Sequence, residues 1–159
     1  MIVFHGCKSE YVGTIYCPYV HYKLRKGASL PEALLLTQAL YDDLTDFSDG
    51  FMLQNAMADA QMTSWKSPFI STTPFRSTAR SFALDRGTKG FIYTIEGPED
   101  AFYDFNKIRL ENQFPQHKTY EWMHEFGIPI ELKSPFEVIQ IEEVTDIIEI
   151  STVRYKKLI

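Results

Sequence analysis

The sequence has few of the features that mark exported, disulfide-stabilised or membrane-inserted proteins. Its 159 residues contain only two cysteines, Cys7 and Cys17, and no C-x-x-C pair, so we expect free thiols and no metal site. No window approaches the roughly 20 apolar residues of a membrane-spanning helix. The opening "MIVFHGCKSE" lacks a basic region followed by an apolar stretch. We therefore expect a cytoplasmic protein, or one delivered into a target cell without a secretory signal.

The chain also lacks an excess of positive charge. Its net charge is −5 and its pI about 5.4, which argues against a protein that coats nucleic acid through a basic face. The "VRYKK" stretch near the C-terminus leaves a local contact open, but a solvated terminal strand is the favoured interpretation.

The composition is otherwise that of a globular domain. Hydrophobic residues make up 45% and charged residues 23%, and the length suits a single domain over residues 1–159. The aromatic share of 14% is high. It serves either a thick β-rich core or a pocket for a planar ligand.

Helical patterns dominate the first half of the chain. A short strand is predicted over residues 2–5, and residues 6–27 read as irregular or briefly helical. Ser29 is the predicted N-cap of the next helix, with Glu32 as its capping-box partner. A second helix is predicted for "FMLQNAMADAQM", whose methionines we assign to a core face.

Strand patterns dominate the second half. "SPFIST" is a predicted strand, followed by a helix that Thr73 caps and Pro74 begins. Further strands are predicted, and "NKIRLENQFPQHKTY" is predicted to be a loop. The strand segments are "GFIYTIEG", a possible "AFYDF", "IPIEL", "FEVIQIEEV" and "DIIEISTVRY". Helices first and strands later favour an α+β fold.

Three short motifs stand out in this order: "FHG" at the end of the first strand, "STT" at the end of the middle strand, and "TYEWMHEFGIP" in a late loop. Together they resemble the ADP-ribosyltransferase fold, in particular bacterial toxin-like and effector-like mono-ADP-ribosyltransferases. The resemblance implies N-terminal helices packed on a split, mainly antiparallel β-sheet. It also implies NAD as co-substrate and no metal.

The resemblance implies that Glu121 is the catalytic residue, because its spacing to Gly127, Ile128 and Pro129 matches the family pattern better than that of Glu125. Cleavage of the bond between the NAD ribose and nicotinamide passes through an oxocarbenium-like species. A carboxylate beside that ribose stabilises the developing positive charge. The alternative is that Glu121 is an ordinary surface glutamate, like others near it in the sequence.

The first-strand motif supplies the expected nucleotide contacts. His5 can hydrogen-bond a ribose hydroxyl while it stays neutral, although a lone histidine on a buried strand is more often a core residue. Gly6 lets a ligand approach the backbone, and by resemblance its backbone would hold the nicotinamide amide. The family more often has Arg than His before a Ser-Thr-Ser motif, so the pattern is mixed.

The middle motif adds further cofactor-binding candidates. By resemblance Ser71 orients the glutamate or contacts the ribose, and Thr72 supports it. Phe75 or Phe82 would stack on nicotinamide, although Phe82 also fits a role in packing its helix on the sheet. A cation for the NAD pyrophosphate would come from one of the two arginines in this helix, Arg76 or Arg80.

The resemblance also implies a macromolecular acceptor, protein or nucleic acid. Thr119 stands where arginine-modifying relatives carry a second glutamate, so an arginine acceptor is not expected. A toxin or effector role implies a neutralising antitoxin or immunity protein as partner. The alternatives are a non-catalytic NAD- or partner-binding module of the same fold, an RNA 2′-phosphotransferase-like enzyme that consumes NAD, and an ordinary α+β binding module. The sequence shows no Arg/His cluster for an RNA phosphate.

Overall fold

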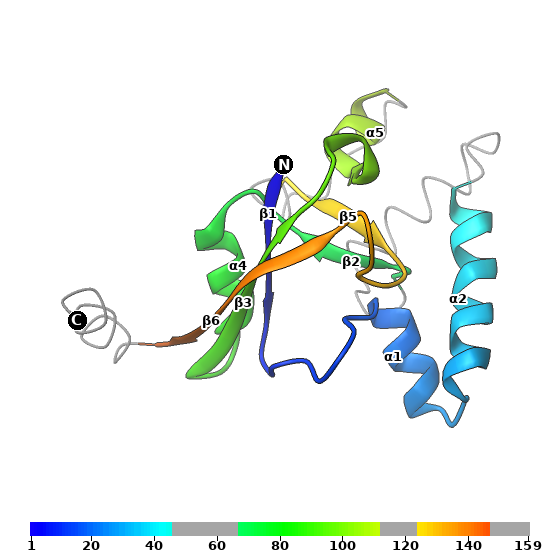
Figure 1. The fold of residues 1–159 in the computed structure, drawn as a ribbon, viewed down its shortest axis with the longest axis horizontal. Helices are drawn as coiled ribbons and strands as arrows, with labels where there is room; N and C mark the ends of the chain where they lie inside the picture. Colours follow the sequence, from blue (N-terminus) through cyan, green and yellow to red (C-terminus); the bar gives the residue numbers. More distant parts are fainter. Residues whose placement is uncertain (46–66, 112–123, 147–159) are drawn as a thin grey trace.

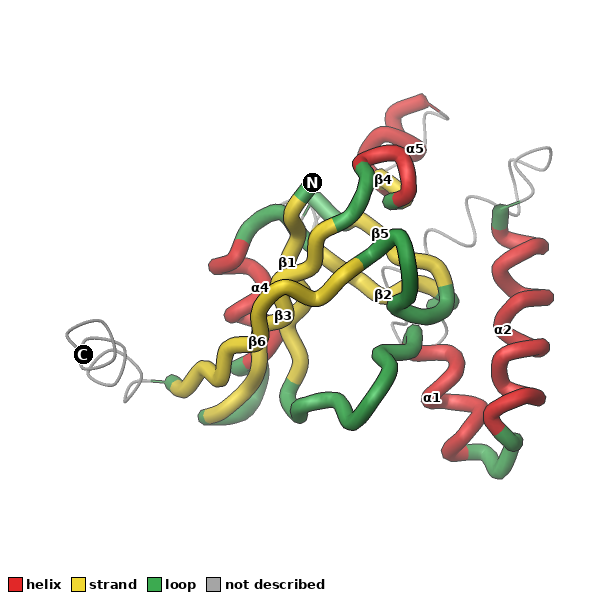
Figure 2. Tube along the Cα trace, viewed as in Figure 1, coloured by secondary structure: helices red, strands yellow, loops and turns green. Residues whose placement is uncertain are grey.

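The computed structural model describes residues 1–45, 67–111 and 124–146. They form two three-stranded antiparallel sheets with helices around them (Figures 1 and 2). The chain is therefore α+β, as the order of patterns predicted. Within the described ranges, no helix combines the length and the apolar character that a membrane crossing needs.

The first sheet has the strand order β1-β3-β6, where β1 is Ile2–Cys7, β3 is Lys89–Glu96 and β6 is Glu137–Thr145. The central strand β3 is buried along its length except at its two ends. Its uninterrupted apolar run fits this position, because a central strand covered on both faces has no solvent side.

The second sheet has the order β2-β5-β4, where β2 is Phe69–Thr72, β5 is Phe126–Pro129 and β4 is Tyr103–Asp104. A bridge between Phe4 and Thr73 joins it to the first sheet. The Phe4 N–H donates to the Thr73 carbonyl at 2.7 Å, and the Thr73 N–H donates back at 2.9 Å. Beyond this bridge β1 and β2 separate, so the β-structure is split along this edge.

The helices cover the sheets from different sides (Figure 1). Helix α4 packs on β1 and β3, and α1 packs against α2 and contacts β2. The helix bounds are Pro18–Arg25 for α1, Leu30–Leu44 for α2, Arg76–Ala83 for α4, Phe105–Glu111 for α5 and Glu99–Ala101 for the 3-10 turn η2.

The close approach of α4 to the first sheet depends on two glycines. A Cβ on Gly6 would lie 1.9 Å from the Ala79 carbonyl oxygen, and one on Gly90 would lie 2.1 Å from the Ala83 carbonyl oxygen. Ala79 and Ala83 are themselves fully buried. Small residues on both elements thus let the helix backbone lie directly on the strands. Gly6 was expected to allow the approach of a ligand, but its missing side chain first serves this helix packing.

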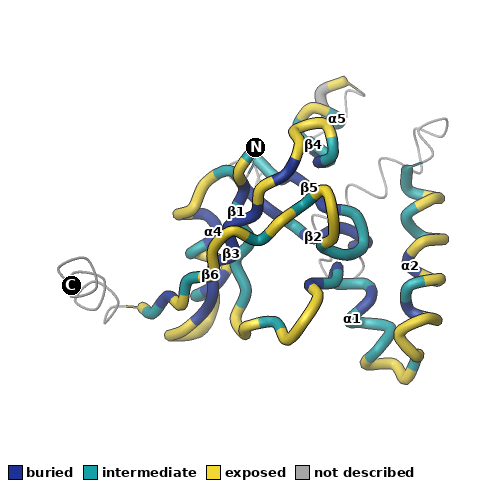
Figure 3. The backbone as a smooth tube through the Cα atoms, in the orientation of Figure 1, coloured by how far each residue is buried: buried dark blue, intermediate teal, exposed yellow. Residues whose placement is uncertain are grey.

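The main core lies between the two sheets and α1 (Figure 3). Val3, Ile70, Ile95 and Ile128 are buried there almost completely. A second cluster, formed by Phe69 and Phe105 with partly buried Tyr41 and Tyr103, holds α2 and α5 against β2 and β4. Both cysteines are free thiols, as expected.

Several local predictions are confirmed. The Ser29 hydroxyl accepts a hydrogen bond from the Glu32 N–H at 3.3 Å and caps α2. The predicted strands at "SPFIST", "GFIYTIEG" and "FEVIQIEEV" are β2, β3 and β6, and "IPIEL" overlaps β5. The helix predicted at "FMLQNAMADAQM" and residues 147–155 of the last predicted strand lie outside the described residues.

Two local predictions are wrong. The N-cap of α4 is Phe75 rather than Thr73, whose hydroxyl instead accepts from the Phe75 N–H at 3.2 Å in a turn before the helix. Residues 105–111, predicted partly as strand and partly as loop, form α5. The possible strand "AFYDF" does contain β4, Tyr103–Asp104. The Asp104 carboxylate accepts from the Lys107 N–H at 3.1 Å, so "DFNK" carries an N-cap signal for the helix that follows.

Candidate functional site

His5 lies at the point where β1 and β2 separate, and both of its ring nitrogens are hydrogen-bonded. Nδ1 is 2.7 Å from the Ser71 carbonyl oxygen, and Nε2 is 3.0 Å from the Tyr11 hydroxyl. A carbonyl only accepts, so Nδ1 must carry the proton. In the neutral ring Nε2 is then the acceptor and Tyr11 the donor.

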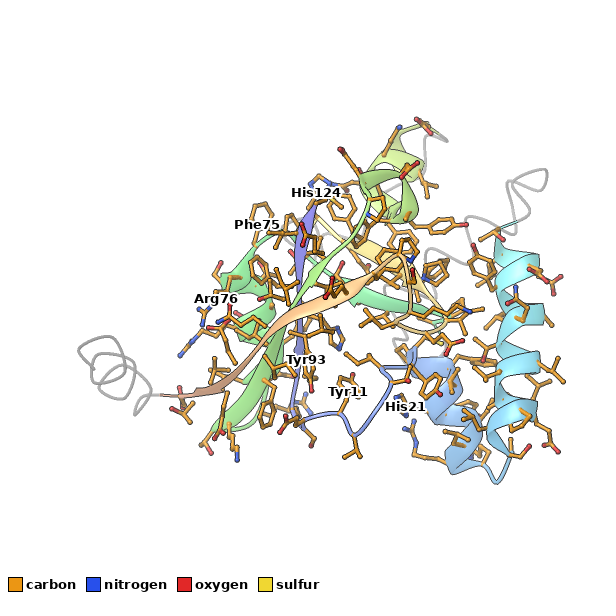
Figure 4. All side chains as sticks on the ribbon, in the orientation of Figure 1. Tyr11, His21, Phe75, Arg76, Tyr93 and His124 are labelled. Carbon is orange, nitrogen blue, oxygen red and sulfur yellow. The ribbon has the colours of Figure 1, made fainter. Side chains whose placement is uncertain are left out.

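The imidazole is held in its neutral form. Burial lowers the pKa of His5, although the hydrogen bond to the Ser71 carbonyl acts in the opposite direction. The backbone N–H of Tyr11 in turn donates to the Tyr93 hydroxyl at 2.8 Å. Figure 4 shows Tyr11 between β3, which carries Tyr93, and α1. The loop after β1 is therefore fixed against the sheet, and it places the Tyr11 hydroxyl at Nε2 of His5.

The backbone of Gly6 presents a free edge at the same place. In antiparallel pairing, alternate residues of a strand direct N–H and C=O toward the same neighbour. Phe4 directs both toward Thr73, so Gly6 directs both to the same side, where Ser71 would be its partner if the pairing continued. The Ser71 carbonyl is bound by His5 instead. Among the described residues, Gly6 therefore has no partner on this edge.

A carboxylate reaches Ser71 from β5. Ser71 pairs with Gly127 in the register of β2 and β5, and side chains two residues apart on a strand share a face. The side chain of Glu125 therefore lies on the Ser71 face, and the Ser71 hydroxyl donates a hydrogen bond to its carboxylate. The ring of Phe105 fills the space at Gly127, where a Cβ would lie 2.8 Å from it.

The environment of Glu125 changes its protonation. Burial raises the pKa of this carboxyl to about 7, and the hydrogen bond from Ser71 partly opposes the rise. The carboxyl is thus divided between its two protonation states near neutral pH. A pKa near the working pH is typical of groups that exchange protons or stabilise charge in catalysis, although buried structural carboxyls also show it.

The residue before Glu125 fixes where β5 begins. His124 adopts a positive φ of 42°, which is uncommon for a residue with a side chain. Its ring stacks on Phe126 with 4.9 Å between centroids, and Nε2 lies 3.4 Å from Asp104 Oδ1. These contacts, on the face opposite to Glu125, hold the turn that directs the Glu125 side chain toward Ser71.

A pocket of about 280 Å³ opens beside His5. Its walls come from the loop after β1, from α1 and from β2, and their residues are His5, Tyr11, Tyr16, Pro18, His21, Arg25 and Ile70. Ile70 lies on the face of β2 opposite to the Ser71 side chain, because neighbouring residues of a strand alternate. The pocket and the Ser71–Glu125 pair therefore lie on two sides of β2. His5 links them, because it lines the pocket and binds the Ser71 carbonyl.

The predicted middle motif divides into two roles. Ser71 belongs to the site, through its carbonyl to His5 and its hydroxyl to Glu125. Thr72 points the other way, is buried, and donates its hydroxyl to the Phe126 carbonyl at 2.7 Å. It supports the site by fixing β5 to β2, and its side chain is closed to a ligand.

The aromatic and basic candidates of α4 lie away from the pocket. Phe75 is 48% exposed and Phe82 37% exposed; neither lines the described pocket, and α4 packs on the sheet through its alanines. Arg76 forms an ion pair with Glu142 at 3.0 Å, and an Arg80 Nη donates to the Thr145 carbonyl at 3.3 Å. The cation that lines the pocket is Arg25 of α1.

The predicted catalytic residue Glu121 and the predicted acceptor-recognition residue Thr119 lie outside the described residues and stay predictions. The carboxylate that the described structure brings to Ser71 is Glu125. The pairing of β2 with β5 identifies it, because Ser71 lies opposite Gly127 and Glu125 is two residues before Gly127. His21 and Arg25 were missed because their link to His5 exists only in the folded chain.

The chain gave no significant match when compared with protein-family models, with curated proteins and with solved structures. Its function is therefore inferred from the geometry of this site.

Proposed function

We propose that the protein is an NAD-dependent mono-ADP-ribosyltransferase with the ADP-ribosyltransferase fold. The observation that carries the proposal is the convergence at Ser71: the imidazole of His5 binds its carbonyl and the carboxyl of Glu125 binds its hydroxyl. These three groups come from distant parts of the chain. They lie at an edge where two strands separate and leave backbone groups of Gly6 unpaired.

The free edge of Gly6 suits the nicotinamide amide. A carboxamide has one acceptor oxygen and an NH₂ donor. The Gly6 N–H can donate to the oxygen while the Gly6 carbonyl accepts from the NH₂. This pairing takes the place of the missing strand partner and orients the leaving group at the split.

Glu125 takes the catalytic role in this proposal. Its carboxylate stabilises the positive charge that develops on the ribose as the bond from C1′ to the nicotinamide nitrogen breaks. Nicotinamide leaves with the bonding electron pair. An acceptor nucleophile then forms the new bond to C1′ and loses a proton, which the carboxylate or solvent takes up.

The acceptor is a protein side chain other than arginine, or a nucleic acid. The residue two positions before Glu125 is Met123, so this carboxylate, like Glu121, lacks an acidic neighbour that would pair with a guanidinium. A toxin or effector role in the cytoplasm, with a neutralising antitoxin or immunity protein as partner, follows from the resemblance and belongs to this proposal.

The test is to incubate wild type, Glu125→Gln and Glu121→Gln with NAD labelled in its adenylate part and a cell lysate. Released nicotinamide and label in protein or nucleic acid are then measured. We expect wild type to transfer label and Glu125→Gln to lose at least about a hundredfold in rate, while NAD affinity stays within a few-fold. Glu121→Gln is the matched control, with the same chemical change four residues away.

Two results would contradict the proposal. Loss of transfer in Glu121→Gln alone would move the catalytic role to that residue. Binding of NAD by wild type without nicotinamide release, in lysates from several sources, would instead indicate the non-catalytic module.

A further inference from the structure

We propose that His21 and Arg25 form the subsite for a phosphate group of the ligand, the diphosphate of a dinucleotide. The identity of the ligand rests on the proposed function; the anion site itself rests on the pocket beside His5. With this proposal the pyrophosphate contact moves from the arginines of α4, which the sequence suggested, to α1.

The two side chains share one face of α1 at the pocket. Residues four apart on a helix are neighbours on its surface, so His21 and Arg25 form adjacent parts of one wall. His5 lies in the same pocket. The sequence showed no Arg/His cluster, and the fold creates one from His5 and α1.

His21 has an unused hydrogen-bonding atom in this pocket. Its Nε2 is buried and has no hydrogen-bond partner among the described residues. The ring is held between Tyr11, stacked at 6.1 Å, and Tyr16, edge-on at 6.3 Å. Figure 4 shows His21 on the side of α1 that faces Tyr11. Buried polar atoms are rarely left unpaired, and a ligand oxygen at Nε2–H would supply the missing partner.

Arg25 provides the charge. Among the described residues it forms no ion pair, and none of the residues lining the pocket carries a carboxylate. Arg76, by contrast, is already bound to Glu142 through two of its nitrogens. A free guanidinium beside an imidazole donor matches a phosphate group, which accepts bidentate hydrogen bonds from arginine.

The electrostatics of the pair agree with an anion between them. Burial lowers the pKa of His21, and the positive charge of Arg25 lowers it further. Without a ligand, the imidazole is therefore neutral beside a cation. A bound phosphate would reduce this repulsion and favour the protonated ring. The titratable side chains lining the pocket are these two, His5, Tyr11 and Tyr16.

The size of the pocket limits what it holds. At about 280 Å³ it lies just below the usual range for pockets that bury a drug-sized ligand, so it accommodates one part of a dinucleotide. His5, which lines the pocket, directly precedes Gly6, whose backbone lies at the split edge. A dinucleotide with its diphosphate at α1 would thus have its nicotinamide end directed toward Ser71.

The test compares binding of ADP and of adenosine by calorimetry in wild type, Arg25→Gln, Arg25→Lys and Lys26→Gln. We expect wild type to bind ADP at least about tenfold more tightly than adenosine. Arg25→Gln should lose about tenfold in ADP affinity and leave adenosine unchanged. Arg25→Lys should fall between, because the charge stays but the planar fork is lost.

Lys26→Gln removes the same charge from the neighbouring position at the end of α1, outside the lining of the pocket. Both Arg25 and Lys26 also interact favourably with the C-terminal end of the helix, so a purely structural role would affect the two variants alike. Equal ADP affinities for Arg25→Gln and Lys26→Gln, or equal affinities of wild type for ADP and adenosine, would overturn the subsite.

This experiment is separable from the test of catalysis, because ADP has no nicotinamide bond to cleave. Arg25-dependent binding of ADP in a protein that leaves NAD intact would retain the subsite and reject the enzyme. Transfer from NAD with no dependence of ADP affinity on Arg25 would support the enzyme and reject the subsite.

Discussion

The Nδ1 of His5 lies 2.7 Å from the carbonyl oxygen of Ser71, a residue 66 positions further along the chain. The imidazole thus occupies the place of a backbone N–H in the ladder between β1 and β2. This substitution ends the pairing of the two strands and leaves the edge of Gly6 open. A single side chain therefore accounts for the split in the β-structure and for the start of the site.

The first prediction concerns the other nitrogen of His5. In Tyr11→Phe the buried Nε2 loses its donor, so we expect the free energy of unfolding to fall by about 1–2 kcal/mol. Chemical denaturation measures it. Tyr16→Phe is the control, because Tyr16 lines the same pocket and makes no described hydrogen bond through its hydroxyl; it should change stability by less than about 0.5 kcal/mol. Equal losses in the two variants would contradict a stabilising hydrogen bond from Tyr11 to His5.

The second prediction concerns the contact of α4 with β1. Gly6→Ala would place a methyl group 1.9 Å from the Ala79 carbonyl, so helix or strand must shift, and we expect a loss of about 1–3 kcal/mol or more. A Cβ on Gly87 would meet nothing closer than 3.9 Å. Gly87→Ala should therefore leave the melting temperature unchanged or slightly raised. A neutral Gly6→Ala would show that α4 is not held against the strand.

The third prediction concerns the titration of Glu125. Its hydrogen bond from Ser71 lowers a pKa that burial raises to about 7, so Ser71→Ala should move this pKa upward. NMR of the carboxyl carbon in protein labelled at glutamate would follow it directly. In Ser81→Ala, which removes an exposed hydroxyl bonded to the Ser77 carbonyl within α4, the titration should match wild type. A lower pKa of Glu125 in Ser71→Ala would contradict the hydrogen bond from the Ser71 hydroxyl.

The fourth prediction concerns stability against pH. A glutamate with a pKa near 4.5 when unfolded and about 7 when folded binds more protons in the folded state between these values. Its contribution to stability is present below pH 4.5 and is lost as pH rises to 7. A tenfold difference in proton affinity between the two states is worth about 1.4 kcal/mol, so we expect a loss of stability on the order of 3 kcal/mol.

Glu125→Gln provides the comparison, because the amide resembles the protonated acid and does not titrate. Denaturation of both proteins from pH 4 to pH 8 should show the variant losing less stability than wild type over this range. Parallel curves would indicate a carboxyl with an ordinary pKa.

The fifth prediction concerns the support of β5. Thr72→Val keeps the shape of the buried side chain but removes the donor to the Phe126 carbonyl, 2.7 Å away. We expect a loss of about 1–3 kcal/mol. Thr72→Ser retains the hydroxyl and should keep most of the stability, at the cost of one buried methyl. If valine proved the milder substitution, packing would outweigh this hydrogen bond.

Local chemistry was enough to predict much of the fold. The mainly apolar sequence of β3 predicts a buried strand without knowledge of its neighbours. The Ser29 cap likewise depends only on Glu32, three residues away. The end of β2 was recognisable from three hydroxyl residues in a row followed by a proline, although Thr72 and Thr73 are buried in the structure. Such signals depend on residues that are close in the sequence, so the sequence alone is enough to predict them.

The composition of the site depended on contacts across the chain. Whether Glu121 or Glu125 faces Ser71 is a question of strand register, and register is set when β2 and β5 pair. Arg25 became a pocket residue only because the loop after β1 brings α1 beside His5. Short-range patterns carry no information about these distances, since burial and strand pairing arise together when the chain folds.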